Sequence, residues 1–277
     1  MSGAAPDPVL IAARRALLDA LDALADHRAS IIVIGAQAVY MHTGGLNLAL
    51  AEETKDADIA VDSRHLQENP RVEQALRDAR FYPDDTKRQP GAWCSPDGLP
   101  VDVMVPERFA GAAARNRRGA RLPPHDNSSM RRAEGLEAAL VDNEVREVVA
   151  LDPGDVRRLD VKVAGPAALL VAKLFKIHEH IAQHRHLEAK DAHDVYRLLR
   201  AVPTRHLADK IRELLNSEVA GDVTRQALHF VRELFGGPDA PGSQLAGNAE
   251  RDVGDPELVS QSVPLLVQDL LADLETS

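Results

Sequence analysis

The sequence predicts an α+β fold with a strand-and-helix N-terminal half and a helical C-terminal half. Short apolar, β-branched runs at residues 31–34, 56–62 and 99–105 indicate strands in the first half. Long segments with helical spacing of apolar residues follow Gly165. Strands followed by helices are typical of the α+β class, and we expect one functional site between the two halves.

Composition describes a globular chain with a sizeable core. The 277 residues are 44% hydrophobic and carry a formal net charge of -10. This charge argues against broad electrostatic adhesion to nucleic acid, which depends on lysine and arginine. The single cysteine, Cys94, excludes an internal disulfide and multi-cysteine metal sites. Because the sequence shows neither a secretory leader nor a membrane-length apolar run, we expect a cytoplasmic protein with no membrane partner.

Four parts are expected along the chain. A helix over residues 8–28, with Asp7 as its N-cap, precedes the first strand, and a further strand is expected around Trp93. The strand-rich domain is followed by a helical domain that completes the site, a Gly/Pro/Asp/Asn-rich linker and a short amphipathic helix. The boundaries of these parts are 1–164, 165–235, 236–257 and 258–277. The leucines of the last helix need a partner surface on this chain or on another.

Three aspartates are the strongest candidate site residues. Asp56 and Asp58 lie two apart in an expected strand, so both side chains project from one face of the sheet. Asp102 is a lone charge in a later strand, where aspartate is disfavoured. Close carboxylates repel unless they are solvated or share a cation, and Mg²⁺ prefers oxygen ligands. We therefore predict that the three converge on Mg²⁺; the alternative is that Asp58 and Asp102 occupy exposed strand positions.

Gly35 marks the junction between the first strand and the helix that follows it. The backbone N–H groups and the dipole of such a helix favour a phosphate. Any tight turn at this point also favours glycine. The position of Gly35 ahead of the strand with two carboxylates makes it a candidate for nucleotide binding.

Together these residues resemble the nucleotidyltransferase superfamily that includes DNA polymerase beta. The shared pattern is the strand–turn–helix at Gly35, a Thr-x-Asp-x-Asp motif at Thr54, and a third aspartate, Asp102. The resemblance implies a nucleotidyltransferase-like mixed sheet flanked by helices. It also implies an NTP substrate and Mg²⁺ or Mn²⁺ held by Asp56, Asp58 and Asp102.

The C-terminal pattern is similar to AbiEii-type nucleotidyltransferases, the toxins of type IV toxin–antitoxin systems. Lys173 and the Lys190-Asp191 pair match the third and fourth motifs of that family. The resemblance covers about residues 30–200 and implies a toxin with a cognate antitoxin and an RNA acceptor such as the tRNA 3′ end. The catalytic residues that it implies are Asp56, Asp58, Asp102, Lys173 and Asp191. The nucleotide-binding residues that it implies are Gly35, Ala36, Thr54, Lys173 and Lys190.

Two positions depart from the family pattern. Ala36 stands where the family prefers glycine or serine, and Glu52 stands where an arginine often precedes the aspartates. Both departures leave open a decayed transferase fold that acts as a binding or regulatory module. The net acidity favours a cationic acceptor, so a small hydroxylated molecule or a protein side chain is the alternative to RNA.

Other charged residues have competing interpretations. The arginines between Pro106 and Glu134 form either an RNA-docking segment or a solvated loop; they are Arg115, Arg117, Arg118, Arg121, Arg131 and Arg132. A salt-bridged helix pair would account for Lys173, Lys176, Asp191 and Asp194 without chemistry. His180 and His184 have the spacing of a helical zinc pair, but no Glu lies between them in a His-Glu-x-x-His arrangement, and a solvated helix explains them better.

Overall fold

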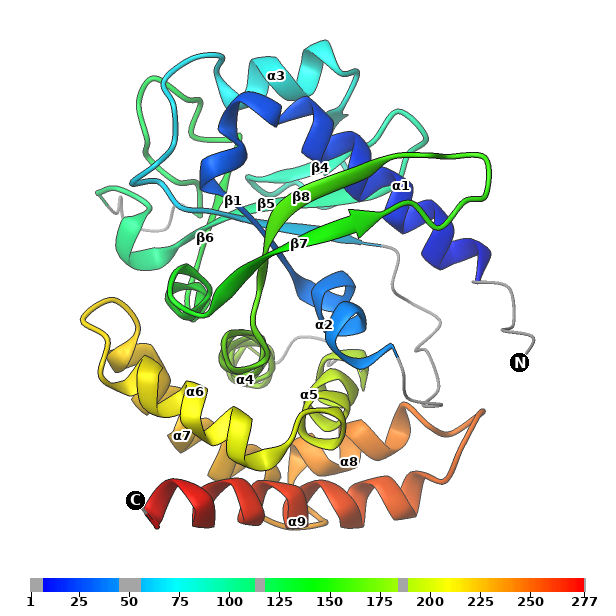
Figure 1. Cartoon of the computed structure of the whole chain (residues 1–277), viewed down its shortest axis with the longest axis vertical. Helices are drawn as coiled ribbons and strands as arrows, with labels where there is room; N and C mark the ends of the chain where they lie inside the picture. Colours follow the sequence, from blue (N-terminus) through cyan, green and yellow to red (C-terminus); the bar gives the residue numbers. More distant parts are fainter. Residues whose placement is uncertain (1–6, 45–55, 113–117, 184–188, 277) are drawn as a thin grey trace. The chain divides into compact units, whose positions relative to one another are not determined.

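The computed structural model describes residues 7–44, 56–112, 118–183 and 189–276. These residues have the α+β fold that the sequence predicts, a mixed eight-stranded sheet with helices and then a largely helical C-terminal region (Figure 1). None of their helices has the length and apolar character that a membrane span requires. The chain forms two compact units. The sheet unit comprises Met1–Gln37, Glu52–Ala133 and Asn143–Val163; the helical unit comprises Ala38–Ala51, Glu134–Asp142 and Ala164–Ser277.

The sheet unit is built around three central strands. Its strands are β1 (Ile31–Ile34), β2 (Ala57–Val61), β3 (Tyr82–Pro83), β4 (Ala92–Cys94), β5 (Pro100–Pro106), β6 (Arg131–Ala133), β7 (Asn143–Val149) and β8 (Arg158–Ala164). They run in the order β3-β4-β5-β2-β1-β8-β7, and β6 pairs with β5. β2 lies between β1, to which it is antiparallel, and β5, to which it is parallel. All residues of β1 are buried, which explains its continuous apolar run.

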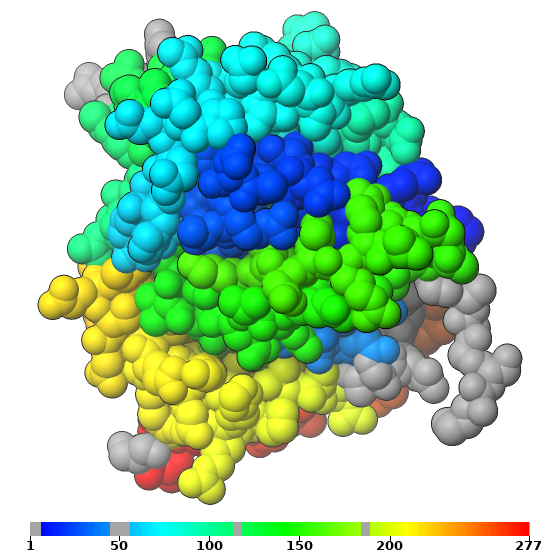
Figure 2. Space-filling view, turned by 45° about the horizontal axis from the view of Figure 1, so that its top comes forward, coloured from blue at the N-terminus to red at the C-terminus, as the bar shows by residue number. Residues whose placement is uncertain are grey.

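Helix α1 (Pro8–Ala23) covers β2 and β5 of the same unit. As predicted, Asp7 is its N-cap, and the Asp7 carboxylate accepts a hydrogen bond of 2.7 Å from the Val9 amide. A 3₁₀ helix, Ala25–Ser30, replaces the last turns of the longer helix expected over 8–28. Figure 2 shows α1 in dark blue beside the green β7–β8 hairpin. Arg157 of that hairpin donates a 2.6 Å hydrogen bond to Asp19 of α1.

The remaining short elements of the sheet unit flank the strands. They are α3 (Val72–Asp78) and the 3₁₀ helix Glu107–Phe109. Val72, Ala75 and Leu76 of α3 are buried. α2 (Gly35–Thr43) begins in the sheet unit directly after β1, and from Ala38 its residues belong to the helical unit.

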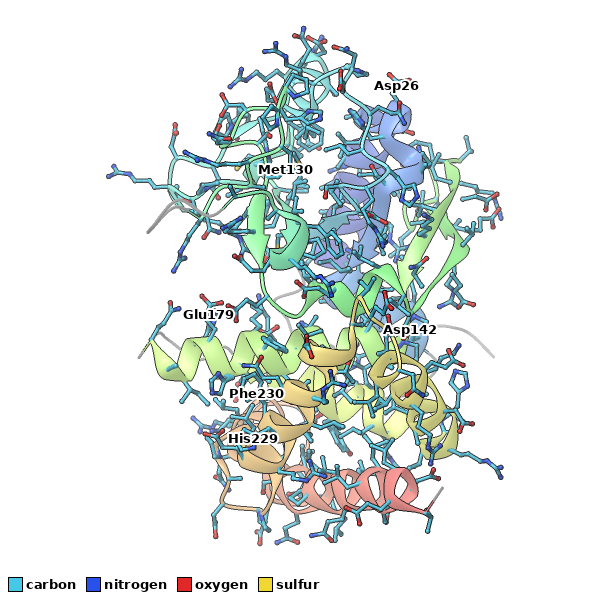
Figure 3. All side chains as sticks on the ribbon, turned by 90° about the vertical axis from the view of Figure 1, so that its left-hand side faces the viewer. Asp26, Met130, Asp142, Glu179, His229 and Phe230 are labelled. Atoms are coloured by element: carbon cyan, nitrogen blue, oxygen red, sulfur yellow. The ribbon has the colours of Figure 1, made fainter. Side chains whose placement is uncertain are left out.

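The helical unit is a bundle around α4. Its elements are the 3₁₀ helix Leu136–Leu140, α4 (Pro166–Ala182), α5 (Ala189–Ala201), α6 (Thr204–Leu215), α7 (Gly221–Phe235), α8 (Pro241–Asn248) and α9 (Pro256–Glu275). α4 contacts α5, α6 and α7. Asp142 lies at the first turn of α4 and accepts a 3.0 Å hydrogen bond from the Ala168 amide (Figure 3). Phe230 of α7, which is labelled in Figure 3, stacks on His178 of α4, with 3.8 Å between the ring centroids.

Helix α8 lies in the stretch for which the composition predicts a linker. A Cβ atom at Gly242 would lie 2.7 Å from the Phe235 ring, so glycine at this position allows α8 to pack closely on α7. α9 packs against α5, α6, α7 and α8. The apolar face of the last helix therefore has its partner surface within its own unit.

Two buried histidines of the sheet unit meet edge to face. The rings of His27 and His125 lie 5.9 Å apart between centroids. His27 is hydrogen-bonded through Nε2 to the Pro70 carbonyl at 2.9 Å, and Nδ1 of His125 accepts a 3.1 Å hydrogen bond from the Val72 amide. Burial lowers the pKa of His125, and the neighbouring His27 lowers it further. Burial also lowers the pKa of His27.

We expect the sheet unit to lose stability as the pH falls from about 7.5 to about 5.5, through the ordinary histidine pKa of about 6.5. In this range unfolding takes up protons, because the pKa of each histidine is lower in the folded state, so acidification favours unfolding. Protonation of His125 at Nδ1 would also place a donor against the Val72 N–H. His125→Asn keeps an acceptor at that position without titrating. Its melting temperature should depend less on pH than that of the wild type; an equal dependence would exclude His125 as the source.

Candidate active site

Strand pairing brings two of the predicted carboxylates side by side. Asp58 of β2 is the direct partner of Ile34 in β1 and of Asp102 in β5. Paired residues on neighbouring strands point to the same face, and neighbouring strands lie about 4.8 Å apart. Asp58 is half-buried, and Asp102 is 8% exposed. Asp56 immediately precedes β2, two residues before Asp58, and is also half-buried.

Gly35 allows the Asp58 carboxylate to reach the start of α2. The φ angle of Gly35 is +68°, a conformation that side-chain-bearing residues rarely adopt. A Cβ atom at this position would lie 2.0 Å from Oδ2 of Asp58. Glycine is therefore required twice, by the backbone and by the carboxylate. The adjoining Ala36 is half-buried at the beginning of the helix.

A lysine that the sequence analysis missed lies among the carboxylates. The ammonium of Lys87 is 3.2 Å from Oδ1 of Asp102, and a guanidinium nitrogen of Arg131 is 3.9 Å from Oδ2. Burial acts to lower the pKa of Lys87, but the charges of Asp102, Asp56 and Asp58 outweigh it and raise the pKa. Lys87 therefore interacts with all three carboxylates. Its position in a polar turn gave no sequence signal, because its partners come together only through strand pairing.

The acidic groups remain under electrostatic tension despite these two cations. Burial raises the pKa of Asp102, and the charge of Asp58 raises it further; Lys87 and Arg131 oppose both effects. Two hard oxygen donors on neighbouring strands, with a third acid beside them, fit the chemistry of a divalent cation such as Mg²⁺. Within the described residues, however, no group of three or more His, Cys, Asp or Glu side chains is gathered closely enough to hold a metal ion.

The predicted lysine and aspartate of the helical unit form a separate charged cluster. Lys173 is 6% exposed, and its ammonium lies 2.6 Å from Oδ1 of Asp191 and 2.6 Å from Oδ2 of Asp194. Lys176 also contacts Asp191, at 2.9 Å. Burial acts against these charges, but the mutual attraction raises the pKa of Lys173 and lowers that of Asp191. Lys190 is half-buried in the first turn of α5.

These residues form the salt-bridged helix pair that the sequence allows, but Lys173, Asp191 and Asp194 are buried and not at the surface. Lys173 is on α4, Asp191 and Asp194 are on α5, and the three connect the two helices in the interior of the unit. The apolar residues around Lys173 in the sequence indicated that it would need a partner if it were buried. That partner is a pair of carboxylates.

The arginines predicted as an RNA-docking segment lie in different surroundings. Arg132 donates a 2.8 Å hydrogen bond to the Gly111 carbonyl, and Arg131 faces Asp102, whereas Arg118 and Arg121 are exposed. Five candidates lie outside the described residues: Glu52, Thr54, Arg115, Arg117 and His184. His178 stacks on a phenylalanine, and in the part of the chain that the structure describes no histidine belongs to a metal cluster.

The described residues therefore combine a mixed sheet, a glycine turn after β1 and two paired carboxylates on neighbouring strands. A comparison with protein-family models matches residues 13–220 to a family described as nucleotidyltransferase. The chain belongs to this nucleotidyltransferase family. Searches of curated proteins and of solved structures returned no significant match.

Proposed function

We propose that this chain is a metal-dependent nucleotidyltransferase that moves an NMP from an NTP to an acceptor hydroxyl and releases pyrophosphate. The observation that carries the proposal is the direct pairing of Asp58 with Asp102, with the Asp58 carboxylate held against Gly35. Family membership supports the same reaction class. Together they supply an acidic site beside a helix start, which suits a nucleotide bound with a cation.

The reaction makes one bond and breaks another at the α-phosphorus. The acceptor oxygen forms a bond to this phosphorus as the bond to pyrophosphate breaks, and the hydroxyl proton must go to a base. Asp102 is the candidate base, because its carboxylate lies beside Asp58 on the neighbouring strand and points to the same face of the sheet. Asp56, Asp58 and Asp102 would hold Mg²⁺ or Mn²⁺. When bound, the ion would neutralise charge on the phosphates and activate the attacking oxygen.

Nucleotide binding is proposed for the turn after β1 and for the predicted lysines. The amides that follow Gly35, beginning with Ala36, lie in the first turn of α2, and the first N–H groups of a helix can bind phosphate. Thr54, Lys173 and Lys190 are proposed from the family resemblance, and Asp191 as the acid that accompanies Lys173. In the structure the Lys173 ammonium is bonded to Asp191, so a direct role on phosphate requires it to exchange that partner.

The acceptor is proposed to be RNA, in particular a tRNA 3′ end, and the protein a toxin with a cognate antitoxin. The C-terminal motif pattern supports this choice, and so does the exposure of Arg118 and Arg121. The test is incubation with each NTP, labelled in turn at the α- or γ-phosphate, and total RNA. Nucleotide transfer predicts that the α-label enters RNA and the γ-label does not. Labelling of a small hydroxylated molecule or protein instead would move the acceptor to the alternative class.

If no transfer is detected, a thermal-shift measurement distinguishes an inactive fold from an active enzyme. A decayed transferase fold should show no product and no thermal stabilisation by NTP with Mg²⁺. A working site should be stabilised by its ligands through mass action. The thermal shift therefore separates an inactive fold from an active enzyme that was offered the wrong acceptor.

Removing Arg118 and Arg121 together is expected to weaken RNA binding. Each arginine that contacts a phosphate releases counterions, so the slope of log affinity against log salt should fall by about one per contact. Binding titrations at several salt concentrations measure both effects. Arg158→Ala is the matched control, because Arg158 is an exposed arginine of the same unit that pairs with Glu147. Equal RNA affinity and an equal salt slope in the double variant would remove this segment from the RNA interface.

A further inference from the structure

The structure places a protein cation at each oxygen of Asp102. Lys87 lies 3.2 Å from Oδ1, and Arg131 lies 3.9 Å from Oδ2. From this geometry we infer that Lys87 competes with a divalent cation for the Asp102 carboxylate and must withdraw from Oδ1 when a metal ion binds there. This inference rests on the proposed function, because it assumes that the paired carboxylates of Asp58 and Asp102 take up a divalent cation.

The turn that carries Lys87 is held in place by hydrogen bonds. Asp84 is buried, and its Oδ1 accepts hydrogen bonds from the backbone amides of Thr86, at 2.8 Å, and Lys87, at 3.2 Å. The Asp84 amide donates to the Ala92 carbonyl at 2.9 Å, which fixes the turn to the beginning of β4. Ala92 is in turn the strand partner of Asp102. The backbone of Lys87 is therefore held at a fixed place beside the carboxylates.

The backbone of Lys87 is fixed, but its side chain can move away from Asp102. It is 30% exposed and has a flexible four-carbon stem. Arg131 is more constrained, since its side chain is 21% exposed and also contacts the Met104 sulfur at 2.8 Å. Of the two cations on Asp102, Lys87 is thus the one that can vacate its place without disturbing a strand.

Charge makes simultaneous occupation unfavourable. A divalent ion bound by Asp102 would lie about 2.1 Å from a carboxylate oxygen, and the ammonium occupies the space next to the same group. Like charges at such separations repel strongly in a partly buried site. Lys87 therefore keeps the acidic cluster compensated in the absence of metal and lowers the affinity for metal.

The test is the binding of Mn²⁺ alone. It is measured by calorimetry and by the electron paramagnetic resonance signal of free Mn²⁺. Lys87→Gln should bind Mn²⁺ about tenfold more tightly or better, because one opposing charge is removed. Lys87→Arg keeps the charge and should stay close to the wild type. Arg88→Gln is the matched control: it removes the same charge from the next residue, which is exposed, and should also leave the affinity unchanged.

A second measurement covers the case in which Lys87→Gln is poorly folded without metal. Its melting temperature should be lower than that of the wild type in chelator and should rise more on addition of Mn²⁺. Equal or weaker Mn²⁺ binding by Lys87→Gln, with weakened binding by Asp58→Asn, would overturn the inference and leave the proposed function intact. Unchanged Mn²⁺ binding by Asp58→Asn would instead remove the metal site on which both depend.

Discussion

Asp58→Asn is expected to abolish nucleotide transfer while the protein remains folded. Metal ions stabilise the charge of such transition states by several kcal/mol, so losing the ligand should lower the rate by about a thousandfold or more. Asparagine has nearly the same shape as aspartate, so it fits the close approach of residue 58 to Gly35. The measurement is incorporation of α-labelled nucleotide at saturating NTP, together with the melting temperature.

The control for this substitution is Asp97→Asn. Asp97 is an exposed aspartate of the same unit that pairs with Arg15 at 3.2 Å. Its replacement changes the net charge equally and should leave transfer at the wild-type rate. If Asp58→Asn transfers nucleotide as fast as Asp97→Asn does, the carboxylates are not the catalytic site.

Lys173→Met is expected to destabilise the helical unit by about 3–5 kcal/mol. The substitution leaves Asp191 and Asp194 buried without their shared cation, and a buried charge without a partner is costly. Denaturant unfolding measures the loss. The effect should be largest near neutral pH and smaller in acid, because protonation of the carboxylates removes the uncompensated charge. Asp191→Asn in the Lys173→Met background should recover part of the stability.

Lys176→Met is the matched control for this prediction. Lys176 lies one helical turn from Lys173 and contacts the same Asp191, but its side chain is 43% exposed. An exposed ion pair contributes about 0–1 kcal/mol, so this variant should unfold close to the wild type. Equal losses in the two variants would show that burial of Lys173 does not determine its contribution. The comparison also indicates whether low activity of Lys173→Met reflects unfolding or a role on phosphate.

The sequence predicted the fold class because the central strand β1 and the long helix α4 have clear hydrophobic patterns. β1 is a fully buried apolar run, and α4 has a long apolar face that begins after a proline. The two aspartates at positions 58 and 102 were visible as charges in β-forming surroundings. The periodicity did not reveal that they are partners on neighbouring strands, since strand order depends on contacts between distant segments.

Two features escaped sequence reasoning for related reasons. Lys87 lies in a polar turn that resembles any solvated loop, and its partners are on other strands. Helix α8 contains two glycines in eight residues, a composition that is typical of linkers. Gly242 is explained by its close approach to Leu234 and Phe235 at the end of α7. In both cases the residue type is determined by a neighbour on another element of the fold.

The register of the central strands also limits how this sequence can change length. An added or deleted residue within β2 would turn Asp58 to the opposite face and bring an apolar neighbour to the acidic surface. The same change in the connection between β2 and β5 would leave both strands paired as they are. Insertions and deletions in naturally occurring variants should therefore occur in the connecting segments. The number of residues between Asp58, the strand partner of Ile34, and each end of β2 should stay constant.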